Sequence, residues 1–227
     1  MKPRLLDLFC GAGGCSVGYS RAGFDVVGVD IEPHPDYPGP LIVDDALEVL
    51  DRPTYLAKFD VIHASPPCQA RTTMSNRWRG QGTRADEHVN LIPEVRDALL
   101  QWGGPYVIEN VPGARRDLRH PITLHGGMFG LGVHRPRLFE SNAPLMAYTA
   151  PPPVNPIGVY GKAADGRRLF TRTDGTEQRA ARSLEEAQTA MGCEWMTDFR
   201  DIAESIPPAM TEYIGSQLIS YLRTEAA

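Results

Sequence analysis

The stretch "RLLDLFCGAGGCSVGYSRAGFDVVGVDIEP", residues 4–33, decides the fold class of this 227-residue chain. It begins with an apolar run typical of a strand, turns through three closely spaced glycines, takes a helical pattern and ends on a second strand pattern, "DVVGVD". Further strand-like runs lie at 40–43, 59–65 and 105–111, separated by helix-like stretches such as 88–102. Strands that alternate with helices predict an α/β fold with a doubly wound, mostly parallel sheet, which binds ligands at the carboxyl ends of its strands.

The length and composition fit one globular folding unit. Hydrophobic residues make up 42% of the chain and charged residues 22%, which argues against disorder. No run approaches the roughly 20 apolar residues of a membrane-spanning helix, and the N-terminus lacks the apolar core of a signal peptide. We therefore expect a cytoplasmic, monomeric protein without a membrane partner. The four cysteines show neither CxxC spacing nor neighbouring histidines, which predicts no metal site.

The net charge of -5 argues against a generally basic surface for nucleic acid. Arginines nevertheless gather locally, within 71–84, 115–119 and 167–172. Such patches can bind phosphate on an acidic protein, although each arginine alone could equally be a solvated loop charge.

The amino-acid pattern changes near residue 143, where a segment rich in Pro, Gly, Thr and Arg begins. We expect a cofactor-binding and catalytic region over 1–145, a small loop-rich insert over 146–185, and C-terminal helices over 186–227 that return to the first region. Ser183, followed three residues later by Glu186, is typical of a capping box, and "PPAMTEYIGSQLISYL" (207–222) predicts a closing helix with proline near its start.

The glycine turn "DLFCGAGG" (7–14) predicts an anion-binding site. Glycines between a strand and a helix let backbone N–H groups approach an anionic ligand at the positive end of the helix dipole. Asp30 and Asp45 follow the next two strands and should reach the same sheet edge, where a carboxylate can accept hydrogen bonds from a ribose. Together these features indicate an adenosine-type ligand, although either aspartate alone could be a helix cap.

A cysteine held behind two prolines forms the second candidate site. Pro66 and Pro67 exclude helix directly after the strand "FDVIHAS", so Cys68 should stand at a strand end that faces the cleft. A lone cysteine is often a small buried hydrophobe, but Glu109 ends the next strong strand and could exchange a proton with a substrate there. In "HRPRLF" (134–139), alternation predicts that both arginines lie on one strand face and hold an acidic or carbonyl group.

With these residues the chain resembles the carbon-5 class of DNA cytosine methyltransferases. "DLFCGAGG" resembles the first cofactor motif of that family, "SPPCQ" its catalytic cysteine motif, "ENV" its glutamate motif and "HRPRLF" its RxR motif, all in the family's order within residues 4–140. "IAESIPPAMTEYIG" (202–215) resembles the closing motif. The resemblance implies a Rossmann-like fold that uses S-adenosylmethionine, with double-stranded DNA as the partner.

The resemblance also implies a covalent mechanism on a flipped-out cytosine. Cys68 would add to carbon 6 of the base, which makes carbon 5 nucleophilic toward the methyl group. Glu109 would protonate or hydrogen-bond the ring nitrogen and the exocyclic amine. Arg137 would hold the base carbonyl, and Arg135 would orient the cleft.

Cofactor and DNA contacts follow from the same motifs. The residues implied to bind the cofactor are Asp7, Phe9, Gly11, Ala12, Gly14, Asp30, Ile31, Asp45, Pro67 and Ser205. The polar stretch after Cys68 resembles the family's catalytic loop, in which the implied DNA contacts are Gln69, Arg71, Arg77 and Arg79.

Two features depart from the family pattern. The closing motif usually has Gly-Asn where this chain has Ala203 and Glu204, which leaves Ser205 as the matching polar contact and predicts repulsion between Glu204 and the cofactor carboxylate. The recognition region is only about 40 residues long, over 146–185, which predicts a short recognition sequence.

Three alternatives remain open from the sequence. An exocyclic-amine methyltransferase also has a motif like "SPPC", but that class stacks the base on an aromatic residue, which cysteine cannot replace. A pyrimidine methyltransferase that acts on RNA or on a free nucleotide would share the thiol chemistry. A catalytically silent DNA-binding homologue would keep the fold, although both Cys68 and Glu109 are present.

Overall fold

The computed structural model describes residues 2–67, 90–161, 164, 166–167, 169–171 and 177–225. Its centre is a seven-stranded sheet in the order β3-β2-β1-β4-β5-β7-β6. The strands are β1 (Arg4–Leu8), β2 (Asp25–Asp30), β3 (Leu41–Val43), β4 (Val61–Ala64), β5 (Tyr106–Asn110), β6 (Ile122–Leu124) and β7 (Arg137–Ser141). The first five are parallel, and β7 runs antiparallel to both β5 and β6. The predicted doubly wound α/β fold with a mostly parallel sheet is confirmed.

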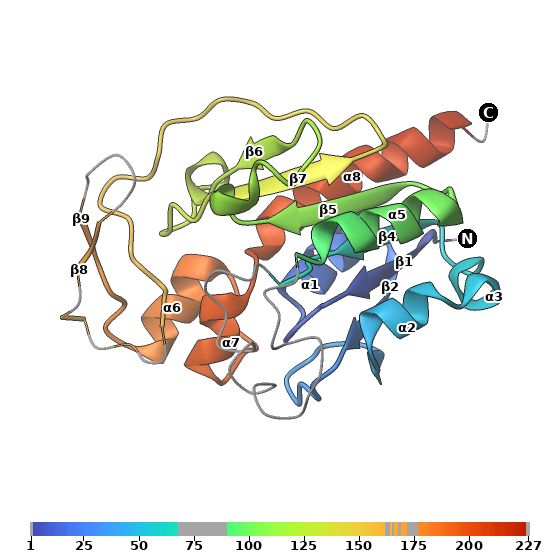
Figure 1. Ribbon diagram of the computed structural model, residues 1–227. Coiled ribbons are helices and arrows are strands. Elements are labelled where there is room, and N and C mark those ends of the chain that lie inside the picture. The colour runs from blue at the N-terminus through green and yellow to red at the C-terminus, as the bar shows by residue number, and fades with distance from the viewer. Residues whose placement is uncertain are drawn as a thin grey trace.

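Helices cover both faces of this sheet (Figure 1). One face packs against α2 (Ala46–Leu50), α3 (Pro53–Leu56) and α5 (Ile92–Trp102), through a core that includes Leu6, Ile62 and Ile108. The opposite face packs against α1 (Gly14–Ala22) and α8 (Pro208–Glu225). Because side chains alternate along a strand, residues 5, 61 and 107 belong to this second face, and so do residues 7, 63 and 109.

Helix α8 crosses α1 at very close range. A Cβ atom on Gly18 would lie 2.0 Å from Thr211 Oγ1 and 2.2 Å from the Pro208 carbonyl oxygen. The Thr211 hydroxyl in turn donates to the Cys15 carbonyl. The closing helix therefore returns to the sheet through α1, as the sequence predicts.

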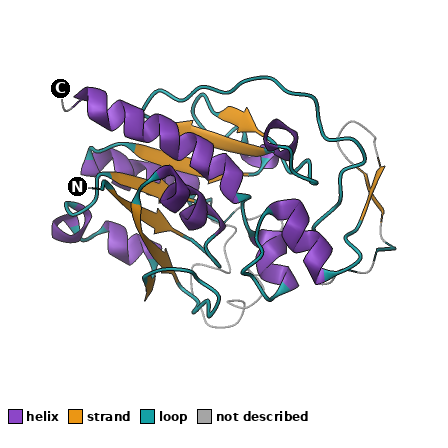
Figure 2. Ribbon diagram, turned by 180° about the vertical axis from the view of Figure 1, so that it is seen from behind, coloured by secondary structure: helices purple, strands orange, loops and turns teal. Residues whose placement is uncertain are grey.

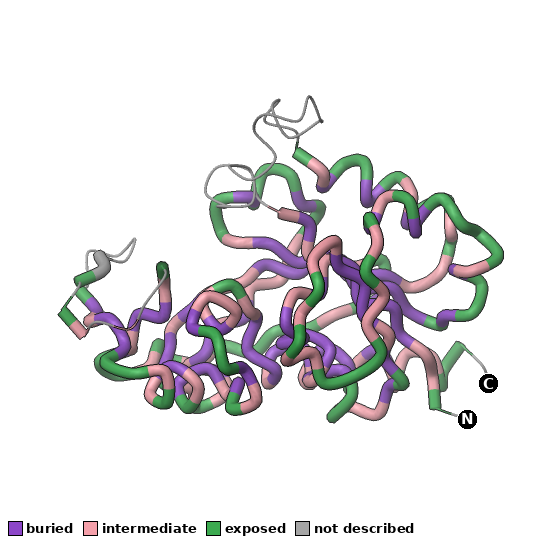
Figure 3. Tube along the Cα trace, turned by 90° about the horizontal axis from the view of Figure 1, so that it is seen from below, coloured by how far each residue is buried: buried purple, intermediate pink, exposed green. Residues whose placement is uncertain are grey.

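A second group of elements lies beyond the carboxyl ends of the parallel strands (Figure 2). It holds α6 (Leu184–Met191) and α7 (Phe199–Glu204), which share a core with Ala12, Val133 and Val159, and a small antiparallel pair, β8 (Leu169–Thr171) with β9 (Glu177–Arg179). Figure 3 shows that buried residues follow the central strands and continue into this group, while exposed residues cover the outer turns. The division of the chain at 145 and 185 stays a prediction.

Most predicted elements are present, with shifted ends. The Ser183 hydroxyl caps α6 by accepting from the Glu186 N–H, as predicted. The Glu186 carboxylate does not close a capping box but accepts from Arg182 N–H and pairs with Arg179. Helices α2 and α3 lie in the helix-like stretch expected between the strand runs 40–43 and 59–65, whereas the strand β6 and the 3-10 turns η2 (Pro112–Ala114) and η3 (Gly126–Phe129) were not predicted. Among the described residues, no helix has both the length and the apolar character needed to cross a membrane.

Candidate active site

The glycine turn between β1 and α1 has the backbone geometry that glycine favours. Gly11 and Gly13 have φ angles of 51° and 90°, and Phe9 just before them also has a positive φ of 59°. A Cβ atom added to Gly11 would meet nothing within 4 Å. The Gly11 N–H donates to Asp30 Oδ2 at 2.8 Å, which ties the turn to the end of β2. The space beside Gly11 leaves room for a ligand at the start of α1.

Asp30 stands at the carboxyl end of β2, as predicted, and is almost fully buried. Its carboxylate accepts from the N–H groups of Gly11 and Glu32, and His34 Nε2 lies 3.6 Å from it. Burial raises the pKa of Asp30, but the interactions with His34 and the two N–H groups outweigh it, so the pKa is lowered. Asp30 is thus a fixed, ionised acceptor at the sheet edge.

His34 joins this edge to the C-terminal helices. Its Nδ1 lies 3.7 Å from the Asp201 carboxylate in α7, while its Nε2 faces Asp30. The interactions with Asp201 and Asp30 raise the pKa of His34 to about 9, although burial opposes this. The protonated imidazole therefore bridges two carboxylates, a role that the sequence analysis missed. The only sequence signal is its position four residues after Asp30.

Further contacts hold the C-terminal segment over the glycine turn. Trp195 Nε1 donates to the Ala12 carbonyl at 3.1 Å, and Asp36 accepts from both the N–H and the hydroxyl of Thr197. A Cβ atom on Gly14 would come within 2.4 Å of the Ile206 carbonyl oxygen. The structure thus brings the first and last predicted motifs together.

Asp45 and Ile31 lie near this edge with different surroundings. Asp45 is the N-cap of α2, and its Oδ1 accepts from the Leu47 N–H at 2.8 Å. Asp45 is therefore a helix cap, the alternative that the sequence left open. Its Oδ1 is used by this bond, and only its Oδ2 is left for another partner. Ile31 follows Asp30 and is half-buried.

The loop after β4 is anchored from β5. Asn110 Nδ2 donates to the Pro66 carbonyl at 2.9 Å, and the Ser65 N–H donates to the Leu8 carbonyl. These bonds fix the backbone two residues before Cys68, with Pro67 half-buried. The predicted sites at Cys68, Gln69, Arg71, Arg77 and Arg79 lie outside the described residues.

Glu109 is buried at the carboxyl end of β5, where the sequence predicts it. Arg137 Nε lies 3.1 Å from Glu109 Oε1, but its N–H is not aimed at that oxygen, which has no hydrogen bond among the described residues. Burial raises the pKa of Glu109, while Arg137, Ser65 and Arg135 oppose the rise. A buried carboxyl with a raised pKa and an unused oxygen can exchange a proton with a ligand.

The prediction that Arg135 and Arg137 share a strand face is wrong. Strand β7 begins at Arg137, and Arg135 precedes it with a left-handed φ of 37°. The Arg135 guanidinium is buried and donates to three backbone carbonyls, those of Ser205, Val159 and Ala203. It therefore clamps the C-terminal segment, while Arg137 alone faces Glu109.

Glu204 and Ser205, in the part of the closing motif that departs from the family pattern, have contacts that the sequence did not predict. The Glu204 carboxylate accepts from Arg200 Nε at 3.0 Å on an exposed face of α7, so its charge is paired outside the turn. The Ser205 hydroxyl donates to the Ile202 carbonyl and lies 3.5 Å from Cys193 Sγ. Ser205 itself lies against Gly14.

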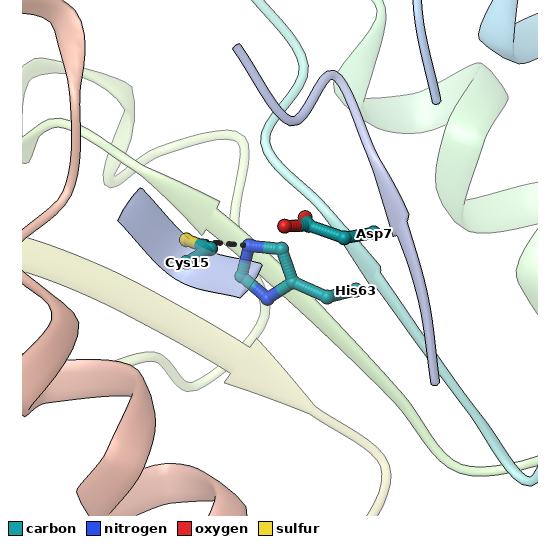
Figure 4. A group of neighbouring side chains, drawn as sticks. All are labelled: Asp7, Cys15 and His63. Carbon is teal, nitrogen blue, oxygen red and sulfur yellow. Dashed lines mark hydrogen bonds between the residues drawn. The ribbon is translucent and has the colours of Figure 1, made fainter. Parts of the chain in front are cut away.

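A buried polar cluster behind the glycine turn was missed by the sequence analysis (Figure 4). Asp7 from β1, Cys15 from α1 and His63 from β4 bring an oxygen, a sulfur and a nitrogen within 4.8 Å of one another. Cys15 Sγ lies 3.4 Å from His63 Nε2, and Ser16 Oγ donates to Asp7 Oδ2 at 2.5 Å. Asp7 Oδ1 has no hydrogen bond among the described residues, and burial raises the pKa of Asp7 to about 7. The signal for this cluster was a histidine within the apolar run "VIHA".

No protein-family model matches the chain. It is 36% identical over 125 residues to the type II methyltransferase M1.HphI of Haemophilus parahaemolyticus, a match that covers 49% of this chain and 33% of that protein. It is 26% identical over 246 residues to the type II methyltransferase M.AgeI of Thalassovita gelatinovora, which covers 92% of this chain and 56% of the relative. The chain therefore spans about a third to about half of the length of these two curated relatives.

Solved structures share the architecture at low sequence identity. The S. pombe Dnmt2 methyltransferase has a TM-score of 0.62 and 14% identity, with 98% of this chain and 99% of that chain covered. A Spodoptera frugiperda DNMT2 mutant has a TM-score of 0.63 and 16% identity, with 96% and 99% covered. The chain has a Rossmann-like methyltransferase fold. With that fold, the glycine turn and Asp30 occupy the strand ends at which such sheets bind their ligands.

Proposed function

We propose that this chain transfers a methyl group from S-adenosylmethionine to carbon 5 of cytosine in double-stranded DNA. The observation that carries the proposal is the buried Glu109 carboxyl, which stands beside Arg137 at the same sheet edge as the glycine turn. The names of the similar type II methyltransferases support methyl transfer to DNA, and the motif resemblance alone supports carbon 5 of cytosine as the target.

The residues at the glycine turn fit the proposed cofactor. Gly11 has open space where a side chain would stand, and the ionised Asp30 can accept from ribose hydroxyls. Phe9, Ile31 and the backbone at Ala12 complete the proposed cofactor contacts, to which Asp7, Gly14, Asp45, Pro67 and Ser205 are added by the resemblance. S-adenosylmethionine would supply the methyl group.

The chain's own residues would activate the base. The Cys68 sulfur would form a bond to carbon 6 of a flipped-out cytosine while Glu109 gives a proton to the ring nitrogen, which leaves carbon 5 electron-rich. Methylation of carbon 5 would release S-adenosylhomocysteine and return the ring-nitrogen proton to Glu109. A base from solvent would then take the carbon-5 proton, and the bond between carbon 6 and sulfur would break, which releases the Cys68 thiolate and restores the aromatic ring. Arg137 would hold the base carbonyl beside Glu109. Gln69, Arg71, Arg77 and Arg79 would contact the DNA.

Product analysis tests the proposal. The purified chain is incubated with labelled S-adenosylmethionine and duplex DNA, and the digested nucleosides are separated into 5-methylcytosine, N4-methylcytosine and N6-methyladenine. We expect only 5-methylcytosine. A methylated exocyclic amine would refute the carbon-5 assignment, and label found in RNA of the same sequence but not in DNA would refute the substrate.

A second experiment tests the covalent step. DNA that contains 5-fluorocytosine blocks the final proton loss, so the wild-type chain should form a stable adduct. The Cys68→Ser variant should bind the same DNA but form no adduct and no product. Undiminished methylation by Cys68→Ser would overturn the role of the thiol. Binding without turnover by the wild-type chain would instead favour the silent homologue.

A further inference from the structure

Four polar side chains lie in neighbouring positions on the sheet face that packs against α1. Asp7 pairs in register with His63 across β1 and β4. The β4–β5 register, in which Ala64 pairs with Ile108, places the next residue Ser65 beside Glu109. Because side chains alternate, His63 and Ser65 share a face with Glu109. A polar row on an otherwise apolar face needs an explanation, since each of these groups costs free energy to bury.

His63 is at the centre of this row, and both ring nitrogens have partners. Nδ1 lies 2.9 Å from the Tyr19 hydroxyl, while Nε2 lies 2.9 Å from the Ser65 hydroxyl and 3.4 Å from Cys15 Sγ. Burial lowers the pKa of His63 to about 3, so the ring is neutral and carries one proton. A neutral ring donates from one nitrogen and accepts at the other, so the Tyr19 hydroxyl at Nδ1 and the partners at Nε2 have opposite roles.

We propose that His63, acting through the Ser65 hydroxyl, is a positioning residue for the Glu109 carboxyl. This inference rests on the proposed function, in which Glu109 exchanges a proton with the base. In this arrangement the Tyr19 hydroxyl would donate to Nδ1 and Nε2–H would donate to Ser65. The Ser65 hydroxyl would then be left to donate to Glu109, the residue that the β4–β5 register places beside it. His63 and Ser65 would thus hold one oxygen of the Glu109 carboxylate through a neutral hydroxyl donor. Glu109 Oε1, which has no hydrogen bond among the described residues, would be left to the ligand.

The remaining groups around Glu109 have different effects. Besides His63, the titratable and charged groups that interact electrostatically with Glu109 are Arg137 and Arg135, Asp7 from β1, and Cys15 and Tyr19 from α1. The two arginines and Ser65 lower the pKa of Glu109 against the effect of burial. Ser65 is the neutral member of that set, and it is the one whose orientation depends on His63.

The test measures the Glu109 proton directly. Infrared difference spectra of the full chain follow the protonated carboxyl band against pH, and the Glu109→Gln variant identifies the band that belongs to Glu109. Because Ser65 stabilises the ionised form, Ser65→Ala should move the midpoint of this titration to higher pH. His63→Leu should move it in the same direction and by less, while Ser65→Thr, which keeps the hydroxyl, should restore the wild-type midpoint.

Tyr106→Phe is the matched control, since it removes the hydroxyl of a buried β5 residue that donates to Glu140 and not to Glu109. We expect its midpoint to match the wild type. The inference would be overturned if the titration midpoint of Glu109 moved equally in Tyr106→Phe and Ser65→Ala. It would also be overturned if the midpoint stayed at the wild-type value in Ser65→Ala, or in His63→Leu. Stoichiometric zinc in the purified wild-type chain that is lost in His63→Leu would do so as well, because a metal ion on Nε2 would displace Ser65.

Activity separates this inference from the proposed function. In single-turnover methylation, the alkaline limb of the pH profile should move upward in Ser65→Ala together with the infrared midpoint. A general loss of rate at every pH, with an unmoved limb, would show a purely structural role and refute the inference. If the wild-type chain makes no 5-methylcytosine while the infrared midpoints still shift, the proposed function fails and the positioning of Glu109 by Ser65 and His63 stands.

Discussion

Arg137 Nε lies 3.1 Å from Glu109 Oε1, and both side chains are almost fully buried. The arginine lowers the pKa of a carboxyl that burial raises. Arg137→Leu should therefore raise the pKa of Glu109 further and remove the proposed contact with the base, with a loss of about 100-fold in kcat/KM on DNA. Arg137→Lys keeps the charge without the planar fork and should show a smaller loss.

Steady-state methylation of duplex DNA measures this effect. Arg223→Leu is the control, because Arg223 is exposed near the end of α8 and should leave the rate unchanged. Wild-type kcat/KM in Arg137→Leu would contradict the role of this pair.

The packing of α8 on α1 predicts a large effect of one methyl group. Gly18→Ala would place a Cβ atom 2.0 Å from Thr211 Oγ1 and 2.2 Å from the Pro208 carbonyl, so the two helices must separate. We expect urea unfolding to show that Gly18→Ala lowers the free energy of unfolding by at least about 1–3 kcal/mol. Gly113→Ala, where a Cβ atom meets nothing within 4 Å, serves as the control and should change the free energy of unfolding little. Equal stability of both variants would show that the helices pack differently.

Arg135 is predicted to stabilise the C-terminal segment and not to touch the base. Its guanidinium donates to the carbonyls of Ser205, Ala203 and Val159. Arg135→Met leaves these buried acceptors without a donor, which should cost about 3–5 kcal/mol in the free energy of unfolding. Because Ser205 lies against Gly14, the variant should also bind S-adenosylmethionine more weakly.

Urea unfolding and calorimetric titration with S-adenosylmethionine measure the two effects of Arg135→Met. The exposed Arg116→Met gives the baseline for loss of an arginine. If Arg135→Met kept the wild-type free energy of unfolding but lost DNA methylation, this prediction would be contradicted. Arg135 would then act on the cleft, as the resemblance implies.

The sheet and its edge could be predicted from the sequence because they depend on local patterns. The period of apolar residues defines β1, β2, β4 and β5, and the carboxyl ends of parallel strands necessarily place the glycine turn, Asp30 and Glu109 at one edge. The closing helix was predictable from its proline and its apolar pattern.

Several side-chain roles could not be predicted because they depend on distant contacts. Arg135 follows an alternating pattern, yet its left-handed backbone turns it toward carbonyls about 70 residues later in the chain. Asp45 has the surroundings of a helix cap, which the sequence left open. His63 and Cys15 are 48 residues apart, so no spacing rule for metal or catalytic motifs connects them. Folding alone makes them neighbours.

The bridge formed by His34 predicts a pH-dependent stability. Its pKa is about 9 in the folded chain, above the usual 6.5, because Asp201 and Asp30 favour the protonated ring. A raised pKa contributes stability that is fully present below pH 6.5 and is lost as the pH rises through 9. The loss should be at most about 3 kcal/mol, and less because the ring is partly exposed.

His34→Asn removes this contribution, so the stability difference between the wild type and this variant should shrink from pH 6.5 to 9.5. Urea unfolding at five pH values measures it, with the exposed His120→Asn as a control that should follow the wild type. A difference that stays constant over this range would show that the imidazole is not charged between the two carboxylates.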